Sequence, residues 1–258
     1  MADPLNGPRL KIEWAKRQIG DLERLIIDWQ TGNPYTIMRG TDTEAGKVYY
    51  KLVNKIPVPD EAQVNAGAVV HSIRSALDLL ACCLARLNGY TNVSETYFPF
   101  GKSKDIFESP AVQRKVKKLH PAHARLIRRL KPYKGGNDLL WAIHELDLMD
   151  KHTMLIPIGS VSTNGVFANN VIKHSAHGEL QFGAPEFASL EDGMIFAAAT
   201  IGTEVEMDIQ FNLTVAFRDI EAIKGEPFIA VLVQFIDLAE RIINIFDRMF
   251  FKRAVNHG

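Results

Sequence analysis

Cysteine is scarce in this chain, and its placement excludes a disulfide framework. Cys82 and Cys83 are the only two cysteines among 258 residues, and they are adjacent. Adjacent cysteines give neither the separation that a disulfide needs nor the spacing of zinc ligands. We therefore expect a protein of a reducing compartment, in which both thiols fill core space.

The chain also lacks an excess of either charge, since 30 basic and 30 acidic residues give a formal net charge of 0. A balanced chain has no global field that draws it to nucleic acid or to a membrane, so any such preference is local. One local imbalance exists. Residues 109–137 contain nine basic residues and no Asp or Glu, which leaves net −9 for the rest of the chain.

No uninterrupted apolar run has the length of a membrane span. The most apolar segment follows Pro227, and charged side chains interrupt it before about 20 apolar residues accumulate. Those charged residues are Asp237, Glu240, Arg241, Asp247 and Arg248. The first 25 residues carry too many charges for a signal peptide. The expected location is the cytoplasm, without a membrane partner.

The common motifs of nucleotide and hydrolase sites are absent. The chain has no GxGxxG, no Walker loop and no GxSxG, so no cofactor is expected. His144, Asp147, Asp150 and His152 are acceptable ligand types for zinc, manganese or iron. They match neither the HExxH spacing nor the paired ExxH spacing, and the sequence predicts no metal site.

Apolar periodicity and turn residues predict helices and strands that are grouped in separate blocks along the chain. The predicted elements are a helix from Pro8 to near Gly32, a hairpin over 35–53, a helix from Glu61 to Leu87 capped by Asp60 and ended by Asn88-Gly89, helices over 104–119 and 121–130, a helix from Leu139 to about Thr153, short strands between 156 and 218, and a helix after Pro227.

This order predicts an α+β fold, because strands do not alternate with helices as βαβ units require. We expect one domain over residues 1–258. Its helical bundle comprises about 1–155 and 225–255, with an N-terminal β-hairpin. A small antiparallel sheet, about 156–220, precedes the C-terminal helix.

Two predicted helices carry polar residues on a shared face. His71, Arg74 and Asp78 are spaced i, i+3, i+7, with Ser75 beside them, so they point the same way. The later helix repeats the spacing with His144, Asp147 and Lys151, while Glu145 and His152 lie on an adjacent stripe. If the two faces meet, histidines, carboxylates and an arginine converge.

Such a cluster has a catalytic and a structural interpretation. A histidine base, an arginine that stabilises an anion and an orienting carboxylate are the groups used in phosphoryl or acyl transfer. The candidate catalytic residues are His71, Arg74, Asp78, His144, Asp147 and His152. In the structural interpretation Arg74 forms a bidentate pair with Asp147 or Asp150 and fixes the register of two core helices.

The basic stretch also has two interpretations. A phosphate-binding face would comprise Lys115, Lys118, Arg125, Arg128 and Arg129. Only Tyr133 is available nearby for base stacking. Alternatively these side chains form a solvated face that acidic residues elsewhere neutralise.

Four segments carry a family resemblance. HSIRSALDLLACCLARL, TYFPFGKSKDIF, KLHPAHARLIRRLKPYKG and LLWAIHELDLMDKHTMLIPI resemble a group of bacterial proteins without a settled activity, over about Val64 to Ile158. The long helix of that group typically reads Arg-Ser-Ala-Leu-Asp-His, which is similar to the Arg-x4-His ribonuclease motif of HEPN helical domains. Here Arg74 is present and Leu79 stands in place of the histidine, so the imidazole would come from His71 or His152.

The resemblance implies a HEPN-like nucleic-acid-associated protein of the stress or defence type, with RNA as partner and an inactive or atypical ribonuclease centre. A homodimer through the long or C-terminal helix is a further hypothesis. The alternative function is a non-enzymatic module that binds a ligand or a protein, in which the polar clusters are structural salt bridges.

Overall fold

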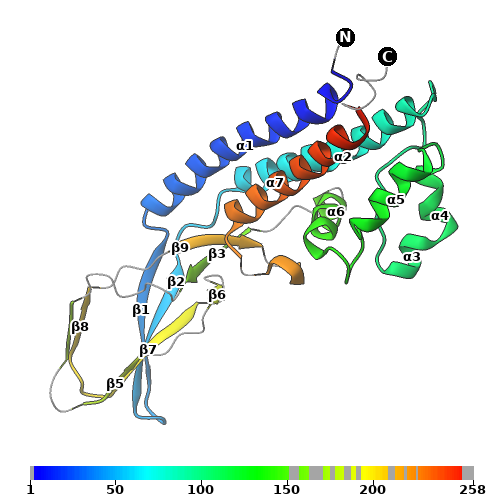
Figure 1. The fold of residues 1–258 in the computed structure, drawn as a ribbon. Coiled ribbons are helices and arrows are strands. Elements are labelled where there is room, and N and C mark those ends of the chain that lie inside the picture. Colours follow the sequence, from blue (N-terminus) through cyan, green and yellow to red (C-terminus); the bar gives the residue numbers. More distant parts are fainter. Residues whose placement is uncertain are drawn as a thin grey trace.

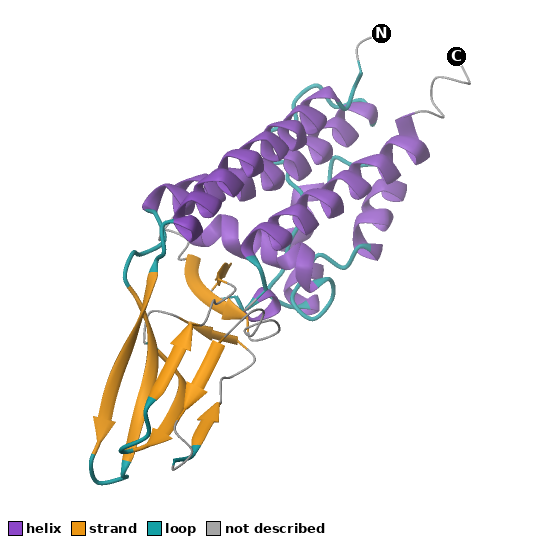
Figure 2. Cartoon of the chain, turned by 90° about the vertical axis from the view of Figure 1, so that its left-hand side faces the viewer, coloured by secondary structure: helices purple, strands orange, loops and turns teal. Residues whose placement is uncertain are grey.

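The chain is an α+β protein, as the sequence predicts, with helices at one end and strands at the other (Figure 2). The computed structural model describes residues 3–150, 157–162, 171–174, 178–182, 187–189, 193–208, 213–217, 220–224 and 226–251. The described part of the chain begins and ends at the helical end, away from the strands (Figure 1).

Three long helices form the body of the bundle. They are α1 (Asn6–Thr31), α2 (Asp60–Leu87) and α7 (Phe228–Phe246). Each of these three helices contacts the other two, and Figure 1 shows them side by side. In α1 the buried residues recur every three or four positions, the period that places apolar side chains on one face. They are Pro8, Ile12, Ala15, Ile19, Leu22, Ile26 and Trp29.

The central helix is α2, which is buried on most of its circumference. Among the described residues it is the one helix long and apolar enough to cross a membrane by length and composition, and most of its apolar window is buried inside the bundle. In the sequence alone, the segment after Pro227 is the most apolar one, and it was the segment compared with a membrane span. A helix that is apolar nearly all round is also what the core of a bundle requires.

A second group of shorter helices lies beside the bundle, and α6 of this group contacts α2. It contains α3 (Lys104–Glu108), α4 (Pro110–Gln113), a 3₁₀ turn (Arg114–Val116), α5 (Pro121–Arg129) and α6 (Asp138–Asp150). The predicted single helix over 104–119 is therefore wrong. Ser109 has extended backbone, with ψ 150°, and Pro110 after it cannot continue a helix from the preceding turn.

The ends of α6 and α2 differ in how they are capped. Asn137 caps α6, because its Oδ1 accepts the Leu140 amide at 3.0 Å. The predicted cap at Asp60 is wrong, since Asp60 is the first residue of α2 and Pro59 precedes it without a side-chain cap. The predicted end of α2 is confirmed, with Gly89 at φ +87°, a value that glycine adopts without strain.

The strands form antiparallel sheets. Their bounds are β1 (Tyr35–Asp42), β2 (Lys47–Asn54), β3 (Pro157–Ser162), β4 (Val171–His174), β5 (Leu180–Phe182), β6 (Phe187–Ser189), β7 (Met194–Thr200), β8 (Val205–Asp208) and β9 (Leu213–Phe217). A four-stranded sheet has the order β1-β2-β7-β5, a three-stranded sheet the order β6-β3-β9, and β4 pairs with β8. The predicted hairpin thus continues into the later sheet through β2 and β7, with Val48 opposite Ala199.

Among the residues that the structure describes, two separate apolar clusters are buried. The larger one fills the helical bundle and includes Val215 and Phe217 of β9. The Phe217 ring lies 4.6 Å from that of Phe228 at the start of α7, so β9 joins the strands to the bundle. The smaller cluster lies between strands and comprises Val48, Tyr50, Leu52, Met194, Phe196, Ala197 and Ala199.

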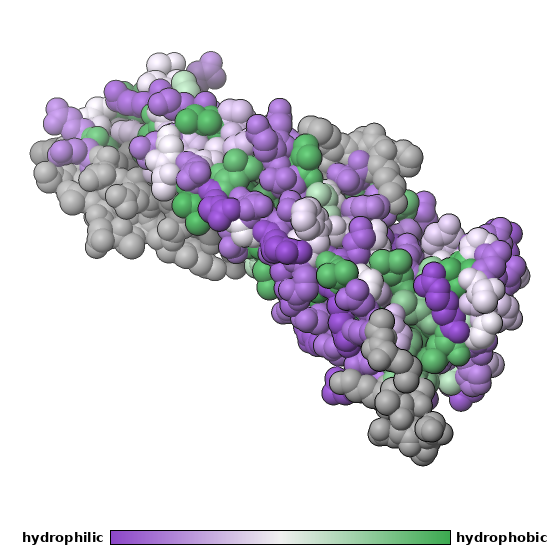
Figure 3. All heavy atoms as spheres, turned by 90° about the horizontal axis from the view of Figure 1, so that it is seen from above, coloured by the Kyte–Doolittle hydropathy of each residue, from purple (hydrophilic) through white to green (hydrophobic). Residues whose placement is uncertain are grey.

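The last turn before the C-terminal segment is π-helical, over Asp247–Phe251. Arg9 of α1 donates to Asp247 at 2.8 Å, which ties this turn to the first helix. Seen from above, the molecular surface is mostly hydrophilic with scattered hydrophobic residues (Figure 3). The exposed apolar residues of α1 are Leu10, Trp14 and Ile27.

Candidate functional site

The two polar faces predicted from the sequence do meet, along the contact between α2 and α6. Three contacts follow one another along α2 in the direction of increasing residue number. Gly67 lies against the Asp150 carboxylate, His71 contacts Asp147, and Arg74 contacts His144. The α6 partners descend in steps of three while the α2 residues ascend in steps of four and three. This order means that the two helices run antiparallel at the site, each contributing one stripe.

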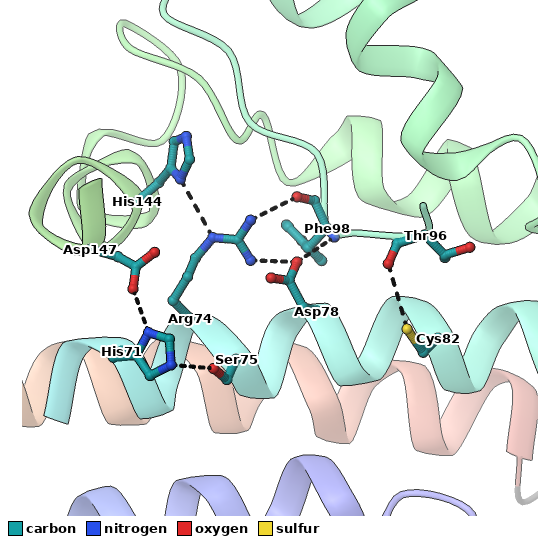
Figure 4. Close-up of polar contacts among 9 residues, drawn as sticks. All are labelled: His71, Arg74, Ser75, Asp78, Cys82, Thr96, Phe98, His144 and Asp147. Carbon is teal, nitrogen blue, oxygen red and sulfur yellow. Dashed lines mark hydrogen bonds and ion pairs between the residues drawn. The ribbon is translucent and has the colours of Figure 1, made fainter. Parts of the chain in front are cut away.

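His71 is held in one orientation by Asp147. Nδ1 of His71 lies 2.9 Å from Oδ1 of Asp147, and Nε2 lies 3.3 Å from Oγ of Ser75 (Figure 4). The His71 side chain is 52% exposed, whereas that of Asp147 is 4% exposed. A buried carboxylate accepts hydrogen bonds, so it favours the tautomer in which Nδ1 carries the proton and the Nε2 lone pair is free to accept.

Arg74 is buried and clasps the loop that follows α2. Its Nη2 donates to the Phe98 carbonyl at 3.3 Å, and its Nη1 lies 2.5 Å from Oδ1 of Asp78. The Nη1 contact is an ion pair without hydrogen-bond alignment, because that nitrogen has no hydrogen-bond partner. The same oxygen of Asp78 accepts the Phe98 amide at 2.8 Å. Both backbone groups of Phe98 are therefore satisfied by one face of α2.

We call the contacts among Arg74, Asp78 and Phe98 the clasp. Aromatic rings pack against it. The Arg74 guanidinium carbon lies 4.6 Å from the ring centroid of Phe100, and the His144 ring stacks on Phe100 at 4.6 Å. Trp141 meets His144 edge-on at 5.3 Å, and its Nε1 donates to Glu145 at 3.1 Å. A cation above a ring face is attracted by the ring quadrupole. His144 is thus packed by rings, which distinguishes it from the exposed His71.

The predicted catalytic residues divide into two groups. His71 and Asp147, with Ser75, form a chain that reaches solvent. Arg74 and Asp78 form the clasp with Phe98, and His144 packs beside it. The 8% exposure of the Arg74 side chain removes it from contact with an external anion in this conformation. The expected pair of Arg74 with Asp147 or Asp150 is replaced by the pair with Asp78. His152 lies outside the described residues.

The donor set gives little for a metal. Among the described residues no group of three or more His, Cys, Asp or Glu side chains is arranged to hold a metal ion. His71 and Asp147 are two ligand types at one point, and a bound zinc ion usually takes at least three protein ligands.

Two of the predicted phosphate-binding lysines are engaged within the chain. Lys118 Nζ donates to the carbonyls of Asn92 at 3.0 Å and Ser94 at 2.8 Å, so it holds the loop before the clasp. Lys115 is half-buried, and burial first, with the positive charge of Arg74 second, lowers its pKa below the ordinary value. Lys118 therefore supports the loop before the clasp, whereas Lys115 is only partly exposed to solvent.

The arginines of α5 are placed differently. Arg125, Arg128 and Arg129 are exposed, and Arg128 donates to the Gln113 side chain at 2.9 Å. Arg125 and Arg129 are spaced i, i+4, so they share one helix face. The exposed cationic side chains of the predicted phosphate-binding set are therefore those of α5.

Sequence reasoning missed the residues that α2 binds. Phe98 and Phe100 supply the backbone groups and the ring of the clasp, and the Phe-Pro-Phe run around Pro99 was the available signal. It also missed His123 of α5, which is 5% exposed and packs edge-on against Phe250 at 4.4 Å. Burial, and His120 to a smaller extent, lowers the pKa of His123 to about 4.

Comparison of the chain with protein-family models, with curated proteins and with solved structures finds no match. The site therefore has to be interpreted from its own geometry.

Proposed function

We propose that this chain is a HEPN-like, RNA-associated protein in which the pair of His71 and Asp147 is the base of an atypical ribonuclease centre. One observation carries the proposal. An exposed imidazole is oriented by a buried carboxylate 2.9 Å away, and its other nitrogen lies 3.3 Å from the Ser75 hydroxyl. This arrangement is that of a general base with its orienting group.

The chemistry requires only a ribose hydroxyl near Nε2 of His71. The imidazole takes the proton of the 2′-hydroxyl, whose oxygen attacks the adjacent phosphorus. The 5′ oxygen leaves with the electron pair of the broken P–O bond and takes a proton from water. Asp147 stabilises the imidazolium that forms. Phosphates further along the strand would contact Arg125 and Arg129, since these side chains are exposed and basic.

The alternative is a non-enzymatic module that binds a protein or a small ligand. The observation that favours it is the clasp of Arg74, Asp78 and Phe98, in which the charges serve packing. In that case the His71 pair would be a further structural contact, and replacing His71 would leave every interaction with RNA unchanged.

The test is the binding and cleavage of a fluorescent single-stranded RNA of mixed sequence by the full chain at several salt concentrations. The double variant Arg125→Ala and Arg129→Ala should weaken binding and reduce the slope of log affinity against log salt by about 1.4, the value for two phosphate contacts on a single strand. His71→Ala should retain binding and lose cleavage. The matched control is Arg39→Ala, an exposed arginine on β1.

Two results would refute the proposal. One is the lack of RNA binding by the wild-type protein at low salt. The other is an unchanged salt slope in the double variant, because binding would then not involve the α5 arginines.

A further inference from the structure

The hydrogen-bond chain at His71 does not end at the imidazole but continues to a hydroxyl of the protein itself. Asp147 Oδ1 lies 2.9 Å from Nδ1, and Ser75 Oγ lies 3.3 Å from Nε2. We propose that Ser75 is a nucleophile, activated by His71, toward carboxylic esters with a small apolar acyl group. The inference shares the His71 base with the proposed function but adds a covalent reaction that RNA cleavage does not contain.

The connectivity is that of an acid, a base and a nucleophile in series. With the Nδ1 proton directed to Asp147, the Nε2 lone pair faces the Ser75 hydroxyl, which donates to it. Oγ and Nε2 are at the long end of hydrogen-bond reach, as is common before a substrate binds. No sequence motif predicts this role, since the serine does not lie in a GxSxG turn.

The two reactive groups are on a rigid element and accessible. His71 and Ser75 are spaced i, i+4, which places them on one stripe of α2 (Figure 4). The residues between them in the sequence, Ser72, Ile73 and Arg74, are buried. Their packing prevents the helix from rotating about its axis. The His71 side chain is 52% exposed, and Ser75 is half-buried. A substrate can therefore approach Oγ from solvent.

Two apolar residues beside His71 and Ser75 on α2 indicate the substrate class. Ala68 is exposed, one turn before His71, and Leu79 is half-buried, one turn after Ser75. Leu79 stands where the HEPN-like motif has its histidine. An apolar side chain there offers a surface to a short acyl chain, whereas an imidazole would compete as a second base.

The reaction balances without any additional reagent except water. The Ser75 Oγ–H bond breaks, its proton passes to Nε2 of His71, and Oγ forms a bond to the ester carbon. The alcohol leaves with the electron pair of the broken C–O bond and takes the proton from His71. Water then attacks the acyl group on Ser75 by the same route, which releases the acid and restores the hydroxyl.

The experiment uses p-nitrophenyl acetate and the full-length protein. The expected result is a burst of nitrophenolate close to one per chain, with an acetyl group located on Ser75 by tandem mass spectrometry. Ser75→Ala should abolish the burst. Ser72→Ala is the matched control, because Ser72 is buried on the same helix and should leave the burst intact.

Two further variants test the groups behind the nucleophile. Asp147→Asn should slow the burst by about tenfold or more, because the amide no longer holds the reactive tautomer. His71→Ala should lose the burst, and added imidazole should restore part of it. A merely structural histidine would not be replaced by free imidazole.

The proposal is overturned if the wild-type protein gives no burst, or if Ser75→Ala keeps the burst or the adduct. Its failure is distinguishable from failure of the proposed function. RNA cleavage by the wild-type protein without a burst would remove the nucleophile alone. A burst without RNA binding would remove only the RNA function.

Discussion

Asp78 binds Arg74 and Phe98 through the same carboxylate oxygen, at 2.5 Å from Arg74 Nη1 and 2.8 Å from the Phe98 amide. Because Arg74 in turn donates to the Phe98 carbonyl, one ion pair on α2 satisfies both polar groups of a buried backbone residue. The position of the loop before Phe100 therefore depends on charges that belong to a single helix.

Arg74→Ala should lower the free energy of unfolding by about 3 kcal/mol, since it leaves the Phe98 carbonyl unsatisfied and breaks a largely buried ion pair. The measurement is the urea midpoint at constant pH and salt. Arg17→Ala, on the exposed side of α1, is the control and should change stability by less than about 0.5 kcal/mol. Equal stability of the two variants would show that the clasp does not stabilise the fold.

Gly67→Ala should destabilise the contact between α2 and α6. A Cβ at Gly67 would lie 2.1 Å from Oδ1 of Asp150, so the carboxylate would have to move. Overpacking outweighs the gain in helix propensity, and we expect a net loss of about 1 kcal/mol. Gly20→Ala on α1 is the control, because open space surrounds it, and should stabilise the protein by about 0.5 to 1 kcal/mol. The measurement is the melting temperature of both variants. A Gly67→Ala variant more stable than wild type would contradict the close approach of Asp150 to Gly67.

Stability should fall in acid partly through His123. Its pKa is lowered from 6.5 to about 4 by burial first and by His120 second. The unfolded chain therefore binds more protons at this site between these pH values. Its stabilising effect is complete above pH 6.5 and is lost as the pH falls towards 4, by on the order of 3 kcal/mol. Urea midpoints across this range should depend less on pH in His123→Phe than in wild type. An identical slope in both proteins would exclude His123 as a source.

Trp29→Phe should cost about 1 kcal/mol, because Trp29 Nε1 donates to the Ile56 carbonyl at 2.9 Å and phenylalanine cannot replace that donor. Trp29 is 5% exposed, and the bond joins the end of α1 to the segment after the hairpin. Trp14→Phe is the matched control at a residue 48% exposed, with an expected change within about 0.5 kcal/mol. Similar denaturant midpoints for both variants would show that the hydrogen bond contributes nothing net.

Local periodicity was enough to predict the long helices and the hairpin, because each of these elements satisfies its pattern within its own segment. It did not predict the pairing of β2 with β7, since these strands are about 140 residues apart in the sequence and their register depends on the packing of Val48, Leu52 and Met194. The helix predicted over 104–119 was wrong because tertiary packing and Pro110 favoured several short turns.

The candidate site was predictable as two stripes but not as pairs of residues. The spacing of His71, Arg74 and Asp78 placed them on one face, and the structure confirms that this face meets α6. Which carboxylate takes which cation depended on the Phe98 backbone, a loop group that no side-chain period reveals. The HEPN-like assignment, the RNA partner, the homodimer and the single domain remain predictions.

The two apolar clusters make the molecule suitable for amide hydrogen exchange. The hairpin is closed at its base by the amides of Lys55 and Ile56, which both donate to the Pro34 carbonyl. Strand amides around Tyr50 can therefore exchange through local opening of the smaller cluster, while those of α2 require opening of the bundle. A ligand on α2 or α5 should slow exchange in the helices and leave β1 and β2 unchanged, so the hairpin serves as an internal reference within the same chain.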